Sequence, residues 1–185
     1  MTEKVAGFSG DGERGRAAGE VMEHLWAPWR MAYVAAPKTE GCFLCHAANA
    51  RTAEAEAAQL VLARRGEAFA LMNRYPYNAG HVMVVPARHV AGLDALSPGE
   101  ALDCWRLVVD TQKALTTICL PDGYNLGINQ GKAGGAGLAE HLHIHVVPRW
   151  EGDHNFMTVM ADARVVPEAL AATAAKIREA FARLP

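Results

Sequence analysis

The sequence predicts an α+β fold with a mainly antiparallel sheet, one long helix and a C-terminal helix. Hairpin signals join several strand-like runs, and helical segments are inserted between them instead of alternating strictly with the strands. The chain has 185 residues, which is most simply one domain that buries roughly two-thirds of its unfolded surface. Its composition, 51% hydrophobic and 21% charged, is ordinary for a soluble globular protein.

The predicted domain begins after a polar N-terminal stretch. Residues 1–20 are rich in glycine and charge without periodic apolar residues, so we expect a flexible arm there and a single domain over 21–185. The aromatic run LWAPWRMAYV is typical of core packing or of a subunit contact. The polar, alanine-rich stretch ANARTAEAEAA indicates either a short helix or a surface excursion.

Alternating apolar residues then predict strands, and a capped helix follows them. The runs at 60–64 and 68–75 precede the turn-forming PYNAG, and HVMVVP (81–86) completes a predicted hairpin over 68–86. Ser97, Pro98 and Glu100 form the start signal of a long helix that reaches about residue 118. The remaining predicted elements are a strand at 124–129, a glycine-rich loop at 129–137, a strand at 141–150 and a closing helix at about 167–184.

The strand predicted at 141–150 begins with HLHIH and carries three histidines at alternate positions. Because residues i, i+2 and i+4 of a strand share a face, His141, His143 and His145 project together. The residues between them project into the core: Leu142, Ile144 and Val146. Such a face fits a metal centre, because imidazole is a common metal ligand. It also fits nucleophilic catalysis by an imidazole whose neighbours fix its tautomer.

The loop NQGKAGGAG lies just before the histidines. Its four glycines allow backbone N–H groups to approach an anion, and Lys132 adds positive charge. A phosphate over the imidazole face, attacked by a histidine, is the simplest interpretation. The sequence has no P-loop and no acidic magnesium cluster, which disfavours an ordinary NTPase or kinase.

The cysteine pair in CFLC predicts a structural zinc site. Cys42 and Cys45 supply two thiolates, and His89 with one triad histidine are the candidates for the other two ligands. Four protein ligands leave no open position for water, so the zinc would be structural. A redox pair would favour a thioredoxin-like context and a disulfide would favour export, and the sequence shows neither.

Charge and hydropathy limit the partners. A net charge of -2 and a pI near 6.4 argue against nucleic acid or an anionic membrane surface as the main partner. The sequence also lacks an apolar run near the ~18 residues of a membrane span and the pattern of a secretory signal. We therefore expect a cytoplasmic protein.

The run HLHIHVV resembles the H-φ-H-φ-H-φ-φ signature, with φ apolar, of the histidine triad (HIT) superfamily. The similarity covers roughly residues 25–160 and includes LWAPWR, CFLC, NRYPYNAGHVMVVP, the glycine loop and PRWEGDHNFM. Within the superfamily the chain looks most like the bacterial branch of diadenosine polyphosphate phosphorylases and hydrolases. The resemblance implies a HIT-like fold and a homodimer that acts on nucleotides, adenosine phosphates above all.

The resemblance also implies residue roles. His143 would attack the α-phosphorus to form a nucleotidyl-imidazole, and His145 would contact the phosphate and help the leaving group depart. The zinc ligands would be Cys42, Cys45, His89 and His141. Contacts to the nucleotide or its phosphates would come from Asn73 at the ribose, His81 near the phosphate path, Asn129 and Gln130 at phosphate oxygens, and Trp150 at the substrate border.

Gly137 departs from the pattern of many hydrolytic members, which have a glutamine at this position. The loss of that amide removes a group that positions water, and a small residue leaves room for inorganic phosphate. We therefore favour phosphorolysis of dinucleoside polyphosphates such as diadenosine tetraphosphate. The alternatives are hydrolysis of these compounds or of nucleoside phosphoramidates, an enzyme with a catalytic metal on all three triad histidines, and a non-catalytic nucleotide-binding zinc module.

Overall fold

The computed structural model describes residues 41–153 and 169–185, and it confirms the predicted α+β fold. Five strands form one antiparallel sheet in the order β1-β2-β3-β5-β4. They span Val61–Arg65 (β1), Ala68–Met72 (β2), Val82–Pro86 (β3), Gly123–Ile128 (β4) and Ile144–Arg149 (β5). The helices span Phe43–Asn49 (α2), Ala53–Ala58 (α3), Pro98–Cys119 (α4) and Leu170–Ala182 (α6), with a short 3-10 helix at Leu93–Ala95 (η1).

The predicted N-terminal arm, residues 1–20, lies outside the described residues, so the division into an arm and a domain at 21–185 stays a prediction.

The predicted long helix is confirmed, and its capping box is formed as expected. The Ser97 side chain accepts the N–H of Glu100, and the Glu100 carboxylate accepts the N–H of Ser97. Over the described ranges, no helix combines the length and the apolar character that crossing a membrane requires.

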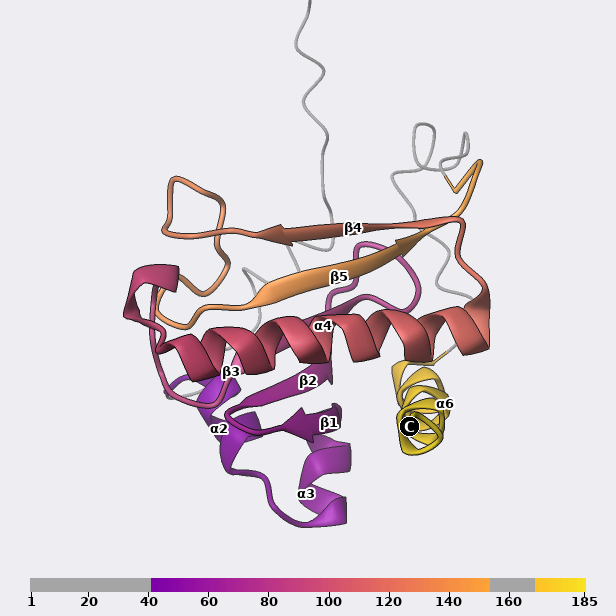
Figure 1. Ribbon diagram of the computed structural model, residues 1–185, viewed down its shortest axis with the longest axis horizontal. Coiled ribbons are helices and arrows are strands. Elements are labelled where there is room, and N and C mark those ends of the chain that lie inside the picture. Colours follow the sequence, from indigo (N-terminus) through magenta and orange to yellow (C-terminus); the bar gives the residue numbers. More distant parts are fainter. Residues whose placement is uncertain (1–40, 154–168) are drawn as a thin grey trace, which may run out of the picture.

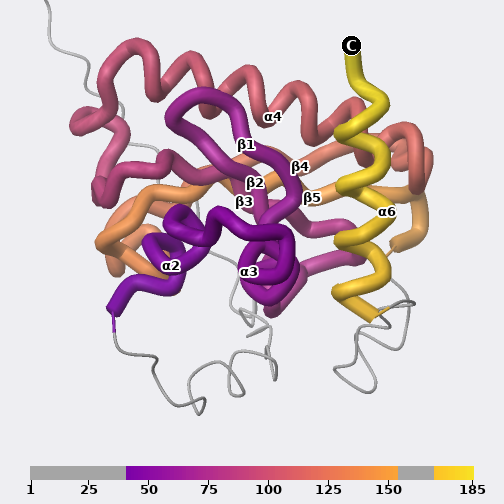
Figure 2. Tube along the Cα trace, turned by 90° about the horizontal axis from the view of Figure 1, so that it is seen from below, coloured from indigo at the N-terminus to yellow at the C-terminus, as the bar shows by residue number. Residues whose placement is uncertain are grey.

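The two faces of the sheet are covered differently (Figures 1 and 2). Helices α4 and α6 pack on one face, where Met72, Val84 and Ile144 contribute to the main core. Helix α2 covers the other face only over β1 to β3, where Phe69 and Met83 contribute to a second core. Strand alternation places His145, which pairs with Met83, on this second face. The α2 helix therefore leaves β5 and β4 available for a site.

The last strand begins later than the sequence predicts. The ladder between β3 and β5 ends at the pair Val84–Ile144, so His141 and His143 precede β5 instead of belonging to it. Pro86 ends β3, and it has no N–H to extend the ladder. The N–H of Leu142 donates instead to the carbonyl oxygen of Val90 at 2.7 Å. The segment that carries two of the three histidines is thus held by contacts outside the sheet.

The hairpin predicted at 68–86 is confirmed as β2 and β3 with a loop over 73–81. Gly80 closes this loop with φ +74°, and a Cβ there would lie 3.2 Å from Pro148 Cγ and 3.3 Å from Leu115 Cδ2. A glycine satisfies both the left-handed backbone and the close approach. His81 follows directly and is fully buried.

Helix α2 is anchored to the sheet by Arg64 of β1. The guanidinium donates to the carbonyl oxygens of Ala47 at 2.9 Å, Ala48 at 3.1 Å and Ala50 at 2.6 Å, and it pairs with Glu56 at 2.7 Å. These carbonyls lie at the C-terminal end of α2, where a helix lacks its own donors and favours a cation. Sequence patterns gave no sign of this contact, because its partners are far apart in the chain.

We expect Arg64→Met to lower the free energy of unfolding by about 1–3 kcal/mol, since it removes the guanidinium donors from the carbonyls at the C-terminal end of α2. Urea denaturation measures the loss. The matched control is Arg65→Met, which removes the neighbouring arginine and its more exposed ion pair with Asp110. That change should cost at most about 1 kcal/mol. Equal losses in the two variants would contradict the anchoring role of Arg64.

Candidate functional site

Four side chains from three parts of the chain meet at one end of the sheet. They are the four residues assigned to a metal site from the sequence: Cys42, Cys45, His89 and His141. Cys42 is the N-cap of α2 and Cys45 lies in its first turn, whereas His89 follows β3 and His141 precedes β5. The Sγ atom of Cys42 lies 3.3 Å from Nδ1 of His141, and that of Cys45 lies 3.1 Å from Nδ1 of His89.

The spacing and chemistry of this cluster fit a four-coordinate metal. Zn–S bonds of about 2.3 Å and Zn–N bonds of about 2.0–2.1 Å place tetrahedral ligand atoms about 3.3–3.8 Å apart. The four ligand atoms here lie within 4.8 Å of one another. Nε2 of His141 donates to the carbonyl oxygen of Pro86 at 2.9 Å, so the Nδ1 lone pair faces the sulfurs. Burial lowers the pKa of His141, which favours the neutral ring that a metal needs.

His143 has its ring proton fixed by the backbone. Its Nδ1 lies 2.9 Å from the carbonyl oxygen of His141, and a carbonyl only accepts, so Nδ1 carries the proton. The lone pair of the neutral ring is therefore on Nε2. Burial lowers the pKa of His143, although the hydrogen bond to the carbonyl opposes this effect. A buried, neutral imidazole with a free Nε2 lone pair is a competent nucleophile.

His145 has the opposite tautomer, and His81 sets it. The N–H of Tyr77 donates to Nδ1 of His81 at 3.0 Å, so the proton of the neutral His81 ring is on Nε2. That Nε2–H donates to Nδ1 of His145 at 2.9 Å. His145 therefore carries its own proton on Nε2, an atom that has no hydrogen-bond partner among the described residues. The chain of contacts leaves one unsatisfied, buried N–H donor beside the cavity.

All three rings of this group are neutral at physiological pH. Burial, reinforced by the nearby His143, lowers the pKa of His145 to about 4. Burial, reinforced by His145 and His143, lowers the pKa of His81 to about 3. Two neighbouring imidazoles in a desolvated site cannot both be charged at low cost, which explains the direction of these shifts.

A cavity of about 330 Å³ extends from His145 along β4 and β5, on the face opposite α4. Alternate residues of β5, His145, Val147 and Arg149, line one side of it. The other lining residues come from β4 and the adjoining loops: Tyr77, Asn78, Asn125, Leu126, Gly127, Asn129 and Asp153. The predicted phosphate contact Asn129 thus shares a cavity with His145.

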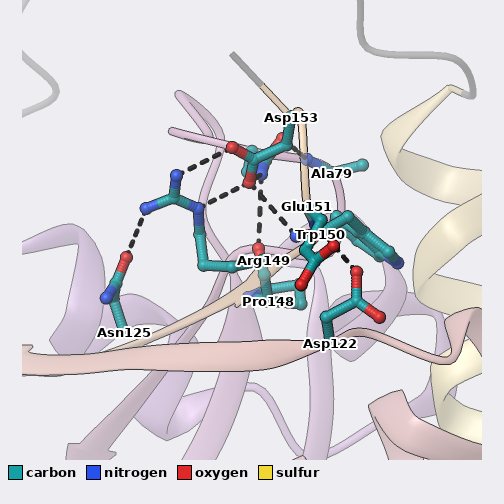
Figure 3. A network of polar contacts seen from close by, with 9 residues as sticks. Ala79, Asp122, Asn125, Pro148, Arg149, Trp150, Glu151 and Asp153 are labelled. Atoms are coloured by element: carbon teal, nitrogen blue, oxygen red, sulfur yellow. Dashed lines mark hydrogen bonds and ion pairs between the residues drawn. The ribbon is translucent and has the colours of Figure 1, made fainter.

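The far end of the cavity is a polar network around Arg149 (Figure 3). Nε and Nη2 of Arg149 donate to the two carboxylate oxygens of Asp153 at 2.6 and 2.8 Å, and Nη1 donates to Oδ1 of Asn125 at 2.5 Å. Nδ2 of Asn78 also donates to Asp153, at 2.9 Å. Side chains alternate along a strand, so the sequence already indicates that Arg149 shares a face with His145. Nothing in the sequence points to Asn78, Asn125 or Asp153.

Neither His143 nor His81 lines this cavity, although both lie beside His145. Four further predicted site residues also lie outside it. The Asn73 amide lies beside His81, with Nδ2 3.5 Å from the ring Nδ1. Gln130 accepts the N–H of Leu93 at 3.3 Å and so faces η1. The Trp150 indole donates to the carbonyl oxygen of Cys119 at 3.1 Å and lines a second cavity of about 420 Å³ between α4 and α6. Gly137 lies exposed in the glycine loop. Their roles stay predictions.

Comparison with known proteins identifies the family. The family model described as the HIT domain matches residues 54–152. The chain belongs to the HIT domain family. It is 38% identical over 181 residues to a protein of Mycobacterium tuberculosis named AP-4-A phosphorylase, with 94% of this chain and 91% of that protein covered. The resemblance inferred from the motifs is confirmed.

Two further relatives of this HIT chain bear on its chemistry. A Schizosaccharomyces pombe protein named bis(5'-nucleosyl)-tetraphosphatase (asymmetrical) is 33% identical over 84 residues, which is 45% of this chain and 46% of that protein. The crystal structure of a zinc-bound histidine triad family protein from Mycobacterium smegmatis matches with a TM-score of 0.55 and 26% identity. That match covers 67% of this chain and 84% of the other.

The lowered histidine pKa values predict a loss of stability on mild acidification. At pH 5 to 6.5 the unfolded chain binds protons on His81 and His145, whereas the folded chain, with pKa values of about 3 and 4, does not. Stability therefore falls as the pH drops, by roughly 2 kcal/mol per histidine between pH 7 and 5. Urea midpoints at both pH values measure this loss. A His81→Gln/His145→Gln variant with an undiminished pH dependence would contradict the assignment.

Proposed function

We propose that this protein cleaves dinucleoside polyphosphates, such as diadenosine tetraphosphate, through a nucleotidyl intermediate on His143. The observation that carries the proposal is the hydrogen bond of His143 Nδ1–H to the His141 carbonyl, which leaves Nε2 as an uncharged nucleophile. The substrate class is supported by the M. tuberculosis relative named AP-4-A phosphorylase, which is similar over 94% of this chain.

The first step transfers a nucleotidyl group to the protein. Nε2 of His143 attacks the α-phosphorus, a P–N bond forms, and the bond from phosphorus to the bridging oxygen breaks. The electron pair of that bond leaves with the polyphosphate, which is ATP when diadenosine tetraphosphate is the substrate. The Nε2–H of His145 donates a hydrogen bond to the departing oxygen, where negative charge develops. The His143 ring, now cationic, keeps its Nδ1–H on the His141 carbonyl.

The second step favours phosphate over water as the acceptor. A phosphate dianion attacks through an oxygen that has no proton, so the P–N bond breaks, the electron pair returns to His143 and ADP forms. Attack by water requires a group that accepts the water's proton. His145 presents Nε2–H at the site, so in this tautomer it donates and does not accept. Gly137 has no side chain, so this part of the glycine loop also leaves room for an added phosphate.

Other residues of the chain have supporting roles in this proposal. Asn129 holds phosphate oxygens, which its place in the His145 cavity supports. His81 keeps His145 in its donor tautomer. Gln130 and Gly137 shape the phosphate loop, Asn73 contacts the ribose, and Trp150 borders the substrate.

We propose zinc as the metal of the cysteine–histidine cluster. Two thiolates and two imidazoles suit Zn²⁺, and the M. smegmatis relative was crystallised with zinc. With Cys42, Cys45, His89 and His141 all bound, zinc would supply a structural cross-link and no open position for a substrate.

We also propose that the protein is a homodimer, joined along α4 and the edge strand β4. Leu102, Trp105 and Val109 lie on one side of α4 and are 49%, 49% and 48% exposed. The Tyr124 hydroxyl of β4 donates to the carbonyl oxygen of Gln112, so this strand runs beside the same flank of α4. Within the described residues β4 is the last strand of the sheet. An apolar stripe next to such a strand edge is a surface that a second copy can cover.

Product analysis with diadenosine tetraphosphate tests the function. With inorganic phosphate the wild-type protein should release ATP and ADP, because phosphate accepts the nucleotidyl group. His143→Ala should lower turnover by about 10³-fold or more, since it removes the nucleophile. Its zinc content and urea midpoint should stay near the wild-type values. AMP formed without phosphate would instead mean hydrolysis, and binding without any product would mean a non-catalytic module.

The oligomeric state tests the dimer surface. Trp105→Glu should convert the protein to a monomer, because it places a charge in the apolar contact. Light scattering coupled to gel filtration measures the mass. Leu93→Glu changes a similarly exposed apolar residue away from α4 and should leave the dimer intact. A Trp105→Glu protein that stays dimeric would exclude this surface.

A further inference from the structure

His141 takes part in two sets of contacts, one through its side chain and one through its main chain. Its ring points into the cysteine–histidine cluster, with Nδ1 3.3 Å from Sγ of Cys42 and 3.6 Å from Sγ of Cys45. Its carbonyl oxygen accepts the Nδ1–H of His143 at 2.9 Å. The residue that contributes to the metal site through its side chain therefore orients His143 through its main chain.

The main chain at this point lacks the support of the sheet. The β3–β5 ladder ends at Ile144, so the carbonyl of His141 lies beyond the last strand pair. Two hydrogen bonds hold the segment: Leu142 N–H to the Val90 oxygen at 2.7 Å, and His141 Nε2–H to the Pro86 oxygen at 2.9 Å. Both acceptors flank His89, which is itself exposed. These two bonds tie the segment to the last residue of β3 and to the turn that follows it.

The cluster connects that turn to a firmly anchored element. Cys42 and Cys45 lie at the start of α2, whose Leu44 and Ala47 are fully buried against the sheet. Arg64 holds the other end of α2. A metal shared by the two thiolates, His89 and His141 would thus join the turn and the His141 segment to α2. Coordination would then restrain the His141 segment, which lies beyond the last pair of the β3–β5 ladder.

We propose that the metal cluster is a positioning device for the nucleophile: coordination fixes His141, and the His141 carbonyl then holds His143 in the Nδ1–H tautomer, with Nε2 aimed at the substrate. The proposal rests on the proposed function of His143. In the metal-free protein the carbonyl is less ordered, so the His143 ring samples both tautomers and other rotamers. The chemical step slows, whereas substrate contacts in the cavity are unchanged.

His89→Ala tests the proposal, because it removes the exposed ligand of the cluster and leaves the His141 segment intact in sequence. The matched control is His46→Ala, which removes another exposed histidine next to Cys45 that is not a member of the cluster. For each protein we would measure zinc content, kcat and KM with diadenosine tetraphosphate and phosphate, and the ¹⁵N resonances of the histidine rings. A wild-type sample stripped with a chelator and then reloaded with zinc covers the case that His89→Ala fails to fold.

We expect His89→Ala and the stripped protein to lose zinc and to show kcat lowered by about 10–100-fold, with KM near the wild-type value. Their His143 ring should give ¹⁵N shifts of mixed tautomers, and zinc should restore the stripped sample. His46→Ala should match the wild type in every measurement. An unchanged kcat in zinc-free protein, or a lowered kcat with the Nδ1–H tautomer retained, would overturn the proposal. Wild-type protein without turnover would refute the proposed function alone, because the ring resonances still report whether zinc orients His143.

Discussion

The hydrogen bond from Nδ1 of His143 to the main-chain oxygen of His141 is the constraint on which the site depends. A carbonyl oxygen accepts and never donates, so the neutral ring has its lone pair on Nε2. Burial keeps the ring neutral by lowering its pKa. The same two conditions, a fixed proton and a desolvated ring, make an imidazole nucleophilic without any help from an acidic residue.

The neighbouring ring of His145 has the opposite tautomer, because its Nδ1 accepts a hydrogen bond instead of donating one. His81 accepts the Tyr77 N–H on Nδ1 and donates its own Nε2–H to Nδ1 of His145, so the proton of His145 is on Nε2, beside the cavity. The site therefore contains one lone pair and one N–H donor on adjacent histidines, a division of roles that identical side chains acquire only from different backbone and ring contacts. The cavity continues from His145 along β5 to Arg149, where the proposed reaction would place the group attached beyond the phosphorus.

The three triad histidines do not share one metal in this geometry. The ring of His141 alone faces the cysteine–histidine cluster, whereas His143 and His145 are bonded through Nδ1 to a carbonyl oxygen and to His81. An enzyme with a catalytic metal on all three rings is thus disfavoured, and the cysteine pair has a clear place beside His141. The sheet is covered unevenly on this face, because α2 packs over β1 to β3 and the cavity lies over β4 and β5.

The sequence by itself determined the family, the hairpin and the capped long helix, because periodicity, caps and turn residues are local properties and the motifs lie in a fixed order. It also grouped the four metal ligands, since the resemblance carried their positions. It did not predict helix α2, which carries the cysteine pair. Only the tertiary structure decided which ring nitrogen of each histidine carries the proton, because tautomers follow from partners such as Pro86, Tyr77 and the His141 carbonyl. It likewise decided that β5 begins at Ile144, that Arg64 anchors α2 and that Asn78 and Asp153 close the cavity. Several of these contacts join residues far apart in the chain, such as His141 with Pro86 and Asn78 with Asp153, and local sequence patterns contain no information about which distant groups will meet. The contacts between near neighbours depend on side-chain orientations that packing fixes.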